Sequence, residues 1–442
     1  MTPPAARAAT DAARAIAAGS LSSEQLVQAC LARIREREPE VQAWQYLDEA
    51  HALEQARARD RESAAGHALG PLHGVPVGVK DIIDTADMPT ENGSVLHVGR
   101  QPVRDAAVVS LLRAAGAVIL GKTVSTEFAT YAAGKTRNPH DPTRTPGGSS
   151  SGSAAAVAAG MVPLALGTQS NASIVRPAAF CGVYGFKPSH GLIPRSGILA
   201  LSRSLDSVGV FARCLDDIAL IAEQLTGFDA ADPDTRPRAR VPFLHTLRSE
   251  PPRAPRLAFV KTAVWDRTDP DTRAAFAGLA AALGGHCDEV ELPGASAAAW
   301  DWHRTVMEAE MAANLAHEWE HGRDKLSPSL RDQLARGREI RAFDYQHALA
   351  QVPRLNAEFA RLFSNFDALI TPATRGTAPA LASTGDPAFG TLWTLAGLPA
   401  LSLPLLRGAD GLPLGVQLVG ARGDDARLLR TARWLHAQVP SH

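Results

Sequence analysis

The sequence predicts an α/β protein in which a large mixed β-sheet carries helices on both faces. Short β-rich runs recur between residues 75 and 212 and again between residues 256 and 420. Segments with helical spacing of apolar residues separate several of these runs. No repeat of 20–50 residues is present, so a solenoid or propeller is not expected. Alternation of strands and helices in a chain of 442 residues favours one large layered domain, spanning residues 1–442.

The first 65 residues are predicted to form N-terminal helices. An Ala-rich segment ends near Gly19, and a Ser22–Gln25 cap precedes a run of apolar residues at helical spacing. A further helix is expected through residues 51–63.

The remaining elements follow from short runs of apolar and β-branched residues. Strands are expected at 75–80, 117–122, 164–168, 182–186, 208–212, 256–260, 368–371, 400–405 and 414–420. Helices are expected at 107–116, at 216–227 and from Asp425 onward. The Pro-, Asp- and Arg-rich segment 228–255 is predicted to be a surface connection. Residues 66–227 are expected to hold the core of the site, and the charged segment 297–364 reads as a helical insertion.

Composition excludes several classes of protein. Lys and Arg total 45 against 46 Asp and Glu, so no basic stripe predicts a nucleic-acid partner. There is no long apolar run for a membrane span and no secretory signal pattern, which predicts a cytoplasmic protein. The cysteines are far apart and form no CxxC pair, which argues against a disulfide framework and a thiolate zinc site; they are Cys30, Cys181, Cys214 and Cys287.

A Gly/Ser-rich turn at residues 147–153 has four interpretations. A flexible linker is disfavoured because the small-residue helix AAAVAAG follows at once. A phosphate-binding loop lacks its closing Lys-Ser/Thr pair. A nucleophile elbow centred on Ser150 needs a preceding strand, and the preceding segment holds three prolines. The fourth interpretation depends on a second turn and on a lysine.

The second turn, residues 167–177, follows the apolar run LALGT and ends near Ser173. A strand that runs into such a turn presents backbone N–H groups that can stabilise an oxyanion. Ser173 on its own reads equally as a helix cap. Lys80 ends another apolar strand, where a salt bridge to an acid is the common role, but a buried lysine becomes neutral and can act as a base. Two serines and one neutral lysine together form a proton-relay nucleophile.

These residues resemble the amidase signature family. The similarity is carried by GVPVGVKD around Lys80, GGSSSGSAAAVAAG around Ser149 and GTQSNAS ending at Ser173, with separations of 69 and 24 residues. Within the family the chain is most similar to malonamidase-like and urethanase-like bacterial members, as LASTGDP, LWTLAG and GVQLVG also indicate.

The resemblance implies the fold of that family and a set of roles. Ser173 would be the nucleophile, Ser149 would relay the proton through a cis peptide, and Lys80 would be the base. The backbone of Ser170, Asn171 and Ala172, with Ser173, would form the oxyanion hole. No metal or cofactor is implied. The substrate would be a small amide or carbamate, the helical insertion would border its entrance, and a homodimer is possible.

Two positions depart from the family pattern. Asn171-Ala172 stands where most members have Gly-Gly; Asn tolerates left-handed backbone, whereas Ala is less permissive. Arg176 lies three residues after the nucleophile, as in malonamidase, where the resemblance implies a clamp for a substrate carboxylate. The alternative is an arginine that ties down the loop.

Two rival classes remain open. His317 and His321 match HExxH in a helical stretch, with Glu318 as the base of a possible zinc hydrolase and Glu339 as a third ligand. With 14 histidines in the chain, this match can be accidental. A catalytically silent family member acting as a binding module is the other class, and the intact Lys80, Ser149 and Ser173 argue against it.

Overall fold

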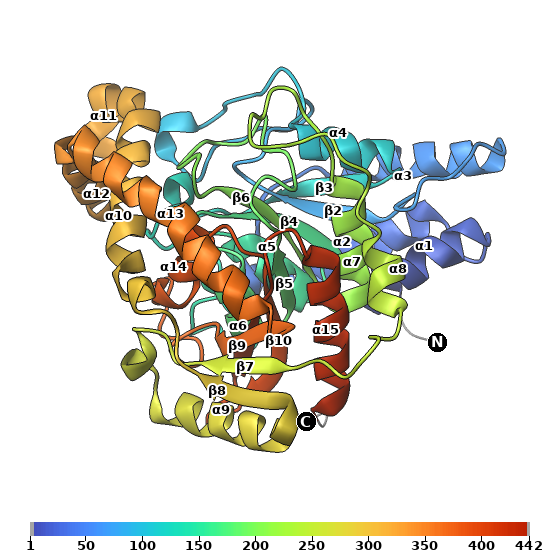
Figure 1. The fold of residues 1–442 in the computed structure, drawn as a ribbon. Helices are drawn as coiled ribbons and strands as arrows, with labels where there is room; N and C mark the ends of the chain where they lie inside the picture. Colours follow the sequence, from blue (N-terminus) through green and yellow to red (C-terminus); the bar gives the residue numbers. More distant parts are fainter. Residues whose placement is uncertain (1–3, 440–442) are drawn as a thin grey trace.

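The computed structural model describes residues 4–439, and these contain a single 11-stranded sheet (Figure 1). The strand order is β1-β3-β2-β4-β6-β5-β10-β11-β9-β7-β8. The strands are β1 (Trp44–Leu47), β2 (Pro76–Lys80), β3 (Val118–Thr123), β4 (Leu164–Gln169), β5 (Tyr184–Lys187), β6 (Ser207–Ala212), β7 (Leu257–Val260), β8 (Cys287–Val290), β9 (Ala368–Pro372), β10 (Ala400–Arg407) and β11 (Pro413–Val419). β2 pairs in parallel with β3 and β4, β7 pairs in parallel with β8 and β9, and the other neighbours are antiparallel. The mixed sheet is therefore confirmed.

Helices cover the sheet and form a separate group on one side of the molecule (Figure 1). They are α1 (Ala9–Ala17), α2 (Ser23–Val41), α3 (Glu49–Ala64), α4 (Ala107–Ala114), α5 (Ser151–Ala158), α6 (Val175–Cys181), α7 (Leu215–Leu225), α8 (Phe243–Arg248), α9 (Pro270–Leu283), α10 (Ala299–Asn314), α11 (Ala316–Gly322), α12 (Pro328–Glu339), α13 (Ala342–Phe363), α14 (Ala388–Leu395) and α15 (Asp425–Gln438). The predicted cap of α2 is a capping box, in which Ser22 and Gln25 exchange side chain-to-backbone hydrogen bonds of 3.0 and 2.9 Å.

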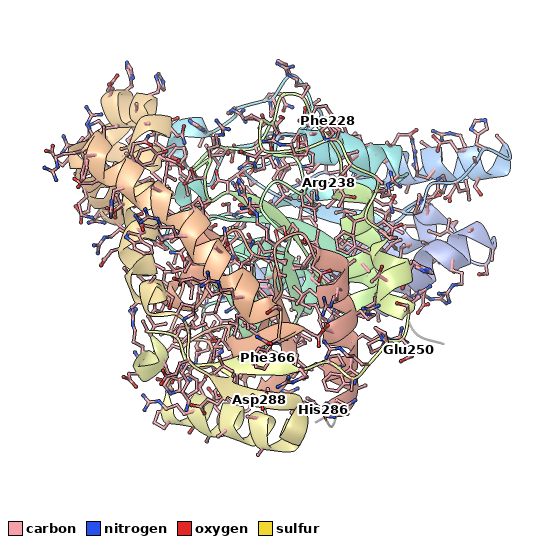
Figure 2. All side chains as sticks on the ribbon, viewed as in Figure 1. Phe228, Arg238, Glu250, His286, Asp288 and Phe366 are labelled. Carbon is pink, nitrogen blue, oxygen red and sulfur yellow. The ribbon has the colours of Figure 1, made fainter. Side chains whose placement is uncertain are left out.

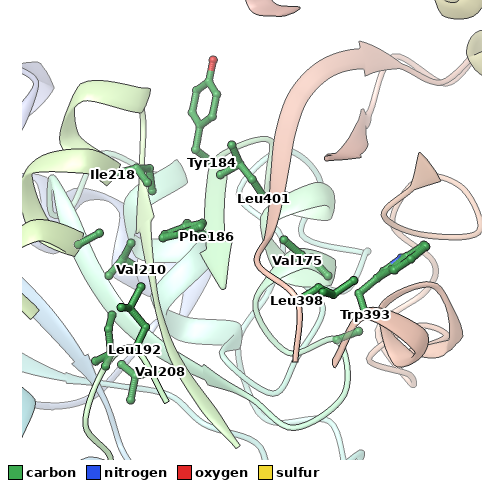
Figure 3. Packing of buried hydrophobic residues seen from close by; sticks show 14 of the residues in the cluster. Val175, Tyr184, Phe186, Leu192, Val208, Val210, Ile218, Trp393, Leu398 and Leu401 are labelled. Atoms are coloured by element: carbon green, nitrogen blue, oxygen red, sulfur yellow. The ribbon is translucent and has the colours of Figure 1, made fainter. Parts of the chain in front are cut away.

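Both faces of the sheet are buried, as the alternation along single strands shows. In β3, Ile119 belongs to one core cluster while Val118 and Leu120 belong to the other. In β6, Val210 belongs to the first of these clusters and Phe211 to the second. Successive side chains of a strand point to opposite faces, so the two clusters lie on opposite sides of the sheet. Figure 3 shows the first cluster, where side chains from β5, β6 and α7 meet and Val175 of α6 lies beside Leu398 and Trp393.

Besides the helices α9 and α14, three short elements were not predicted from the sequence. β1 interrupts the expected N-terminal helices and pairs antiparallel with β3, but four residues are too few for a period to emerge. β8 is a partly exposed edge strand that carries two acidic residues. α8 lies inside the expected surface connection 228–255 and packs against α7 and α15. Each of these elements depends on a partner distant in the chain.

Charged and polar side chains cover the outside of the molecule, among them Glu250 and Asp288 (Figure 2). Phe228 is an exposed aromatic side chain on this surface. Within residues 4–439, no helix combines the length and the apolar character needed to cross a bilayer.

Candidate active site

Lys80 is the last residue of β2 and is completely buried. Its Nζ atom donates hydrogen bonds of 2.8 Å to Ser149 Oγ and of 2.8 Å to Thr168 Oγ1. Burial lowers the pKa of Lys80 to about 7, and the charge of Asp206 opposes this effect only in part. The partners of the amine are therefore uncharged hydroxyl groups, and its neutral form is accessible near neutral pH.

The neighbouring acid, Asp81, has a different partner. Its carboxylate lies 3.8 Å from Nζ of Lys122, which also donates to the carbonyl of Ile83 at 2.7 Å. Among the ion pairs formed by residues 4–439, none involves Lys80. Lys122 therefore forms the salt bridge that is common for a lysine, whereas the amine of Lys80 is not part of an ion pair in that range.

Ser149 lies in the Gly/Ser-rich turn just before α5, and a cis peptide bond joins it to Gly148, as the family resemblance implied. The hydroxyl group of the adjacent Ser150 is already engaged in two hydrogen bonds of 3.2 Å. It accepts from the N–H of Thr168 and donates to the carbonyl of the same residue. Gly152 packs so closely that a Cβ there would lie 2.2 Å from the carbonyl oxygen of Ala43. The turn is therefore a packed part of the core and not a flexible linker.

Arg176 holds this turn from α6. Its side chain is fully buried; Nε and Nη2 donate to the carbonyl of Gly148 at 3.3 and 2.8 Å, and Nη1 donates to the carbonyl of Gly385 at 2.8 Å. Burial lowers the pKa of Arg176 to about 10. Its guanidinium group thus ties the serine turn to the segment before α14, which is the arrangement expected of a structural arginine.

The turn that carries Ser173 is fastened by Gln169, a residue that the sequence analysis did not single out. Oε1 of Gln169 accepts hydrogen bonds from the N–H groups of Ile174 and Val175 at 2.8 and 3.1 Å. Its Nε2 donates to Thr394 Oγ1 at 2.9 Å. A glutamine at the end of a buried strand was the available signal, because a buried amide needs partners for both ends.

Three successive carbonyl groups of this turn are held by donors. The carbonyl of Ser170 accepts from His303 Nε2 at 2.8 Å, that of Asn171 accepts from Thr394 Oγ1, and that of Ala172 accepts from the N–H of Arg176 at 2.9 Å. Within residues 4–439, the N–H groups of residues 170–173 have no acceptor. Since C=O and N–H of a trans peptide point in opposite directions, fixing the carbonyls of residues 170–172 also fixes the N–H groups of residues 171–173. They suit a bound oxyanion.

The Asn171-Ala172 departure has a structural explanation. The residues with positive φ in the described chain do not include either of them, so neither position needs glycine or the left-handed tolerance of Asn. The Asn171 side chain donates to Tyr131 Oη at 3.0 Å and accepts from Thr391 Oγ1 at 2.6 Å. The tolerance of Asn for left-handed backbone is therefore not used at this position: side-chain hydrogen bonds hold Asn171 in an ordinary backbone conformation.

The structure joins two of the three predicted catalytic residues directly. Lys80 and Ser149 are hydrogen-bonded, whereas Ser173 Oγ forms no hydrogen bond within residues 4–439. The helix after Ser173 nevertheless packs on the serine turn: Arg176 bonds Gly148, and a Cβ on Gly147 would meet Pro177 Cα at 2.8 Å. Ser173 is thus a hydroxyl group without a partner, next to fixed amides.

Two cavities reach this turn. The larger, of about 620 Å³, is lined by Tyr131, Asn171, Trp300, His303, Met307 and Gly385, among others. The smaller, of about 260 Å³, is lined by Thr168, Ser170 and Asp206 together with apolar side chains and further charged ones, such as Arg195 and Asp232. Lys80, Ser149 and Ser173 are not among the lining residues, but their direct neighbours are. α10 and α12 of the predicted insertion contribute to the larger cavity.

The HExxH match lies in α11, and its residues have other partners. Glu318 accepts a hydrogen bond from His97 Nε2 at 3.0 Å, and His321 Nδ1 bonds the carbonyl of His317 at 3.0 Å. In the described part of the chain, no three His, Cys, Asp or Glu side chains are grouped as metal ligands. The position of Glu318 is explained by His97.

Comparison with known proteins agrees with this geometry. The model of the Amidase family matches residues 25–429. The chain is 36% identical to one subunit of the glutamyl-tRNA(Gln) amidotransferase of Chloroflexus aggregans, covering 94% of this chain and 93% of that protein. It superimposes on the peptide amidase of Stenotrophomonas maltophilia with a TM-score of 0.87 and 32% identity, covering 99% and 98% of the two chains. A 6-aminohexanoate cyclic dimer hydrolase bound to its substrate gives a TM-score of 0.88 with 28% identity over 98% and 97%.

The family match extends over most of the chain, and the relatives align almost from end to end. The fold, the buried lysine and the two serine turns thus have one explanation: the chain belongs to the amidase signature family of C–N hydrolases.

Proposed function

We propose that this enzyme hydrolyses the C–N bond of a small, uncharged amide or carbamate through a Ser173–Ser149–Lys80 relay. The observation that carries the proposal is the fully buried Lys80, whose amine lies 2.8 Å from the Ser149 hydroxyl and has no ion-pair partner in residues 4–439. A neutral amine in this position can accept the proton of a serine.

The relay proceeds in balanced steps. Lys80 takes the proton of Ser149 as Ser149 takes that of Ser173, and Ser173 Oγ bonds the substrate carbonyl carbon. The N–H groups of residues 170–173 hold the resulting oxyanion. The C–N bond then breaks, and the proton stored on Lys80 returns through Ser149 to the leaving nitrogen. A water molecule repeats the relay on the acyl-enzyme, which releases the acid and restores Ser173.

The charges around the larger cavity favour an uncharged substrate. Arg336 pairs with Glu308, and Arg267 pairs with Asp386 at 2.8 Å, so two of its cations are already neutralised. The guanidinium group of Arg176 already donates hydrogen bonds to two backbone carbonyls. A substrate carboxylate would have to displace one of these partners, at the cost of leaving a buried group unpaired. This supports neutral amides and carbamates over malonamate-like acids.

A substrate panel tests both parts of the proposal. Malonamate-like acids, neutral aryl amides and aryl carbamates are assayed with the wild type, Ser173→Ala and Arg176→Ala. We expect turnover of the neutral substrates, its loss in Ser173→Ala, and a similar decrease on every substrate in Arg176→Ala. A loss confined to carboxylated substrates in Arg176→Ala would instead support the carboxylate clamp.

A further inference from the structure

A histidine of the helical insertion contacts the nucleophile turn, which comprises residues 170–173 and ends at Ser173. His303, in α10, is 2% exposed, and its Nε2 lies 2.8 Å from the carbonyl oxygen of Ser170, 133 residues away in sequence. His303 also lines the larger cavity. Since a carbonyl oxygen only accepts hydrogen bonds, the ring must carry its proton on Nε2. Burial lowers the pKa of His303 to about 4, which keeps the ring neutral at physiological pH.

The contact acts on one particular peptide unit. The carbonyl of Ser170 and the N–H of Asn171 belong to the same planar group, so the direction of one determines that of the other. The neighbouring units are held from α14, by Thr394, and from within α6, by the N–H of Arg176. His303 is therefore the residue through which the insertion fixes the first of these three amides. A donor on the carbonyl also polarises the peptide and strengthens its N–H.

We propose that His303 is a positioning residue that aims the Asn171 N–H at the oxyanion formed on the substrate. The inference rests on the proposed serine hydrolase mechanism and extends it: the helical insertion helps to build the oxyanion hole besides bordering the cavity. Its effect belongs to the transition state, because the oxyanion exists only there and in the tetrahedral intermediates.

Two substitutions separate hydrogen bonding from packing. His303→Met keeps a side chain of similar length without a donor, whereas His303→Gln places an amide nitrogen close to the position of Nε2. We expect kcat for a neutral aryl amide to fall about 10- to 100-fold in His303→Met, below the loss seen when an oxyanion donor is deleted outright. KM should change less than about threefold, and His303→Gln should recover most of kcat.

A matched control comes from His73, which is also buried and bonds a backbone carbonyl, that of Arg59, at 2.9 Å. His73→Met removes the same kind of hydrogen bond away from the nucleophile turn, so it should lower thermal stability without a selective loss of kcat. As a second readout, an aldehyde inhibitor that forms a tetrahedral adduct on Ser173 should bind less tightly to His303→Met, while the corresponding alcohol, which forms no adduct, should bind equally to both proteins.

The outcomes separate the two proposals. Wild-type kcat and wild-type aldehyde affinity in a folded His303→Met variant would overturn the role of His303 while leaving the relay intact. Absence of any Ser173-dependent turnover in the wild type would overturn the relay itself. If His303→Met does not fold, His303→Gln and His303→Asn decide: the shorter Asn cannot reach Ser170, so equal kcat in these two variants would contradict the proposal.

Discussion

Lys80 shows how the surroundings of one side chain select its chemistry. Lys80 and Lys122 are both buried, but Lys122 faces Asp81 whereas Lys80 faces two hydroxyl groups. Burial lowers the pKa of both, to about 7 for Lys80 and about 8 for Lys122. Only Lys80 is therefore placed to exchange a proton with a serine.

The first prediction concerns the pH dependence of catalysis. In the proposed relay the active form of Lys80 is the neutral amine, so kcat/KM should rise as pH increases through about 7, the pKa that burial gives this group. The measurement is a pH profile of kcat/KM on a neutral amide between about pH 5.5 and 8.5. Lys80→Met should lower kcat by about 100-fold or more. A flat profile in the wild type would contradict the role of Lys80.

The second prediction uses Asp206, whose negative charge raises the pKa of Lys80. Asp206→Asn removes that charge, so the acid limb of the profile should move to lower pH. The same profile measured on Asp81→Asn is the control, because Asp81 acts on Lys122. A shift of the limb to higher pH in Asp206→Asn would be incompatible with this electrostatic coupling.

At the scale of secondary structure, the positions of α5 and of the nucleophile turn depend on close contacts at glycine residues. α5 begins directly after the turn that carries Ser149, and its small residues let it approach the sheet. Gly390 of α14 faces Ala172, whose Cβ would lie 2.8 Å from a Cβ added at Gly390. The methyl group of Ala172 thus occupies the space that glycine leaves on α14.

The third prediction tests the packing of α5. A Cβ on Gly152 would lie 2.2 Å from the carbonyl oxygen of Ala43 and 2.3 Å from the nitrogen of Val124, both backbone atoms that cannot rotate away. Gly152→Ala should therefore lower the free energy of unfolding by about 2 kcal/mol or more and reduce activity. Gly278→Ala in α9 is the control: nothing lies within 4 Å, so it should stabilise by up to about 1 kcal/mol. Urea unfolding measures both.

The fourth prediction tests the Ala172–Gly390 contact. Gly390→Ala should push the nucleophile turn away and reduce kcat, because the neighbouring amides would move. Adding Ala172→Gly removes the opposing methyl group and should restore part of the activity, giving a positive coupling in a double-mutant cycle. Independent effects of the two changes would show that the contact does not act on the turn.

For the molecule as a whole, burial of charged groups in the large core makes stability depend on pH. Lys80 and Lys187 are fully buried, and burial lowers the pKa of each to about 7, against an ordinary value of 10.5. Between about pH 7 and 8 the unfolded chain holds these protons and the folded chain has released many of them. The unfolded state then binds more protons, so the free energy of unfolding rises with pH.

The fifth prediction is the size and sign of this slope. Urea unfolding between about pH 7 and 8 should show a rise of up to about 1.4 kcal/mol per pH unit for each lysine that stays neutral. Lys80→Met should reduce the slope. At more alkaline pH the rise should weaken, because burial raises the pKa of Cys30 to about 12 and the unfolded thiol ionises first. A fall in stability from about pH 7 to 8 would contradict the assignment.

Much of the architecture could be predicted because local patterns carry it. The strands around Lys80 and before Ser173 are continuous apolar runs, and a buried central strand needs little else to be recognised. β1 and β8 were missed because their pairing, not their composition, makes them strands. The pairing into a homodimer and the division of the chain into segments stay predictions.

Sequence motifs pointed only to the groups that are proposed to react. Lys80, Ser149 and Ser173 stand in long motifs, but the residues that hold them do not. Gln169 and His303 lie in segments without a catalytic pattern, and their roles depend on which carbonyl or N–H group they reach. The contact of His303 with Ser170 joins residues 133 positions apart, and no spacing along the chain encodes it.

The amino-acid sequence alone determined the class of fold and the three groups proposed to move protons, because short runs of neighbouring residues carry both signals. Tertiary structure decided the state of those groups: folding buried Lys80 without an ion-pair partner among residues 4–439, turned Arg176 toward two backbone carbonyls, and brought His303 to Ser170. The physical reason is that the pKa of a side chain and the direction of a peptide dipole are set by neighbours in space.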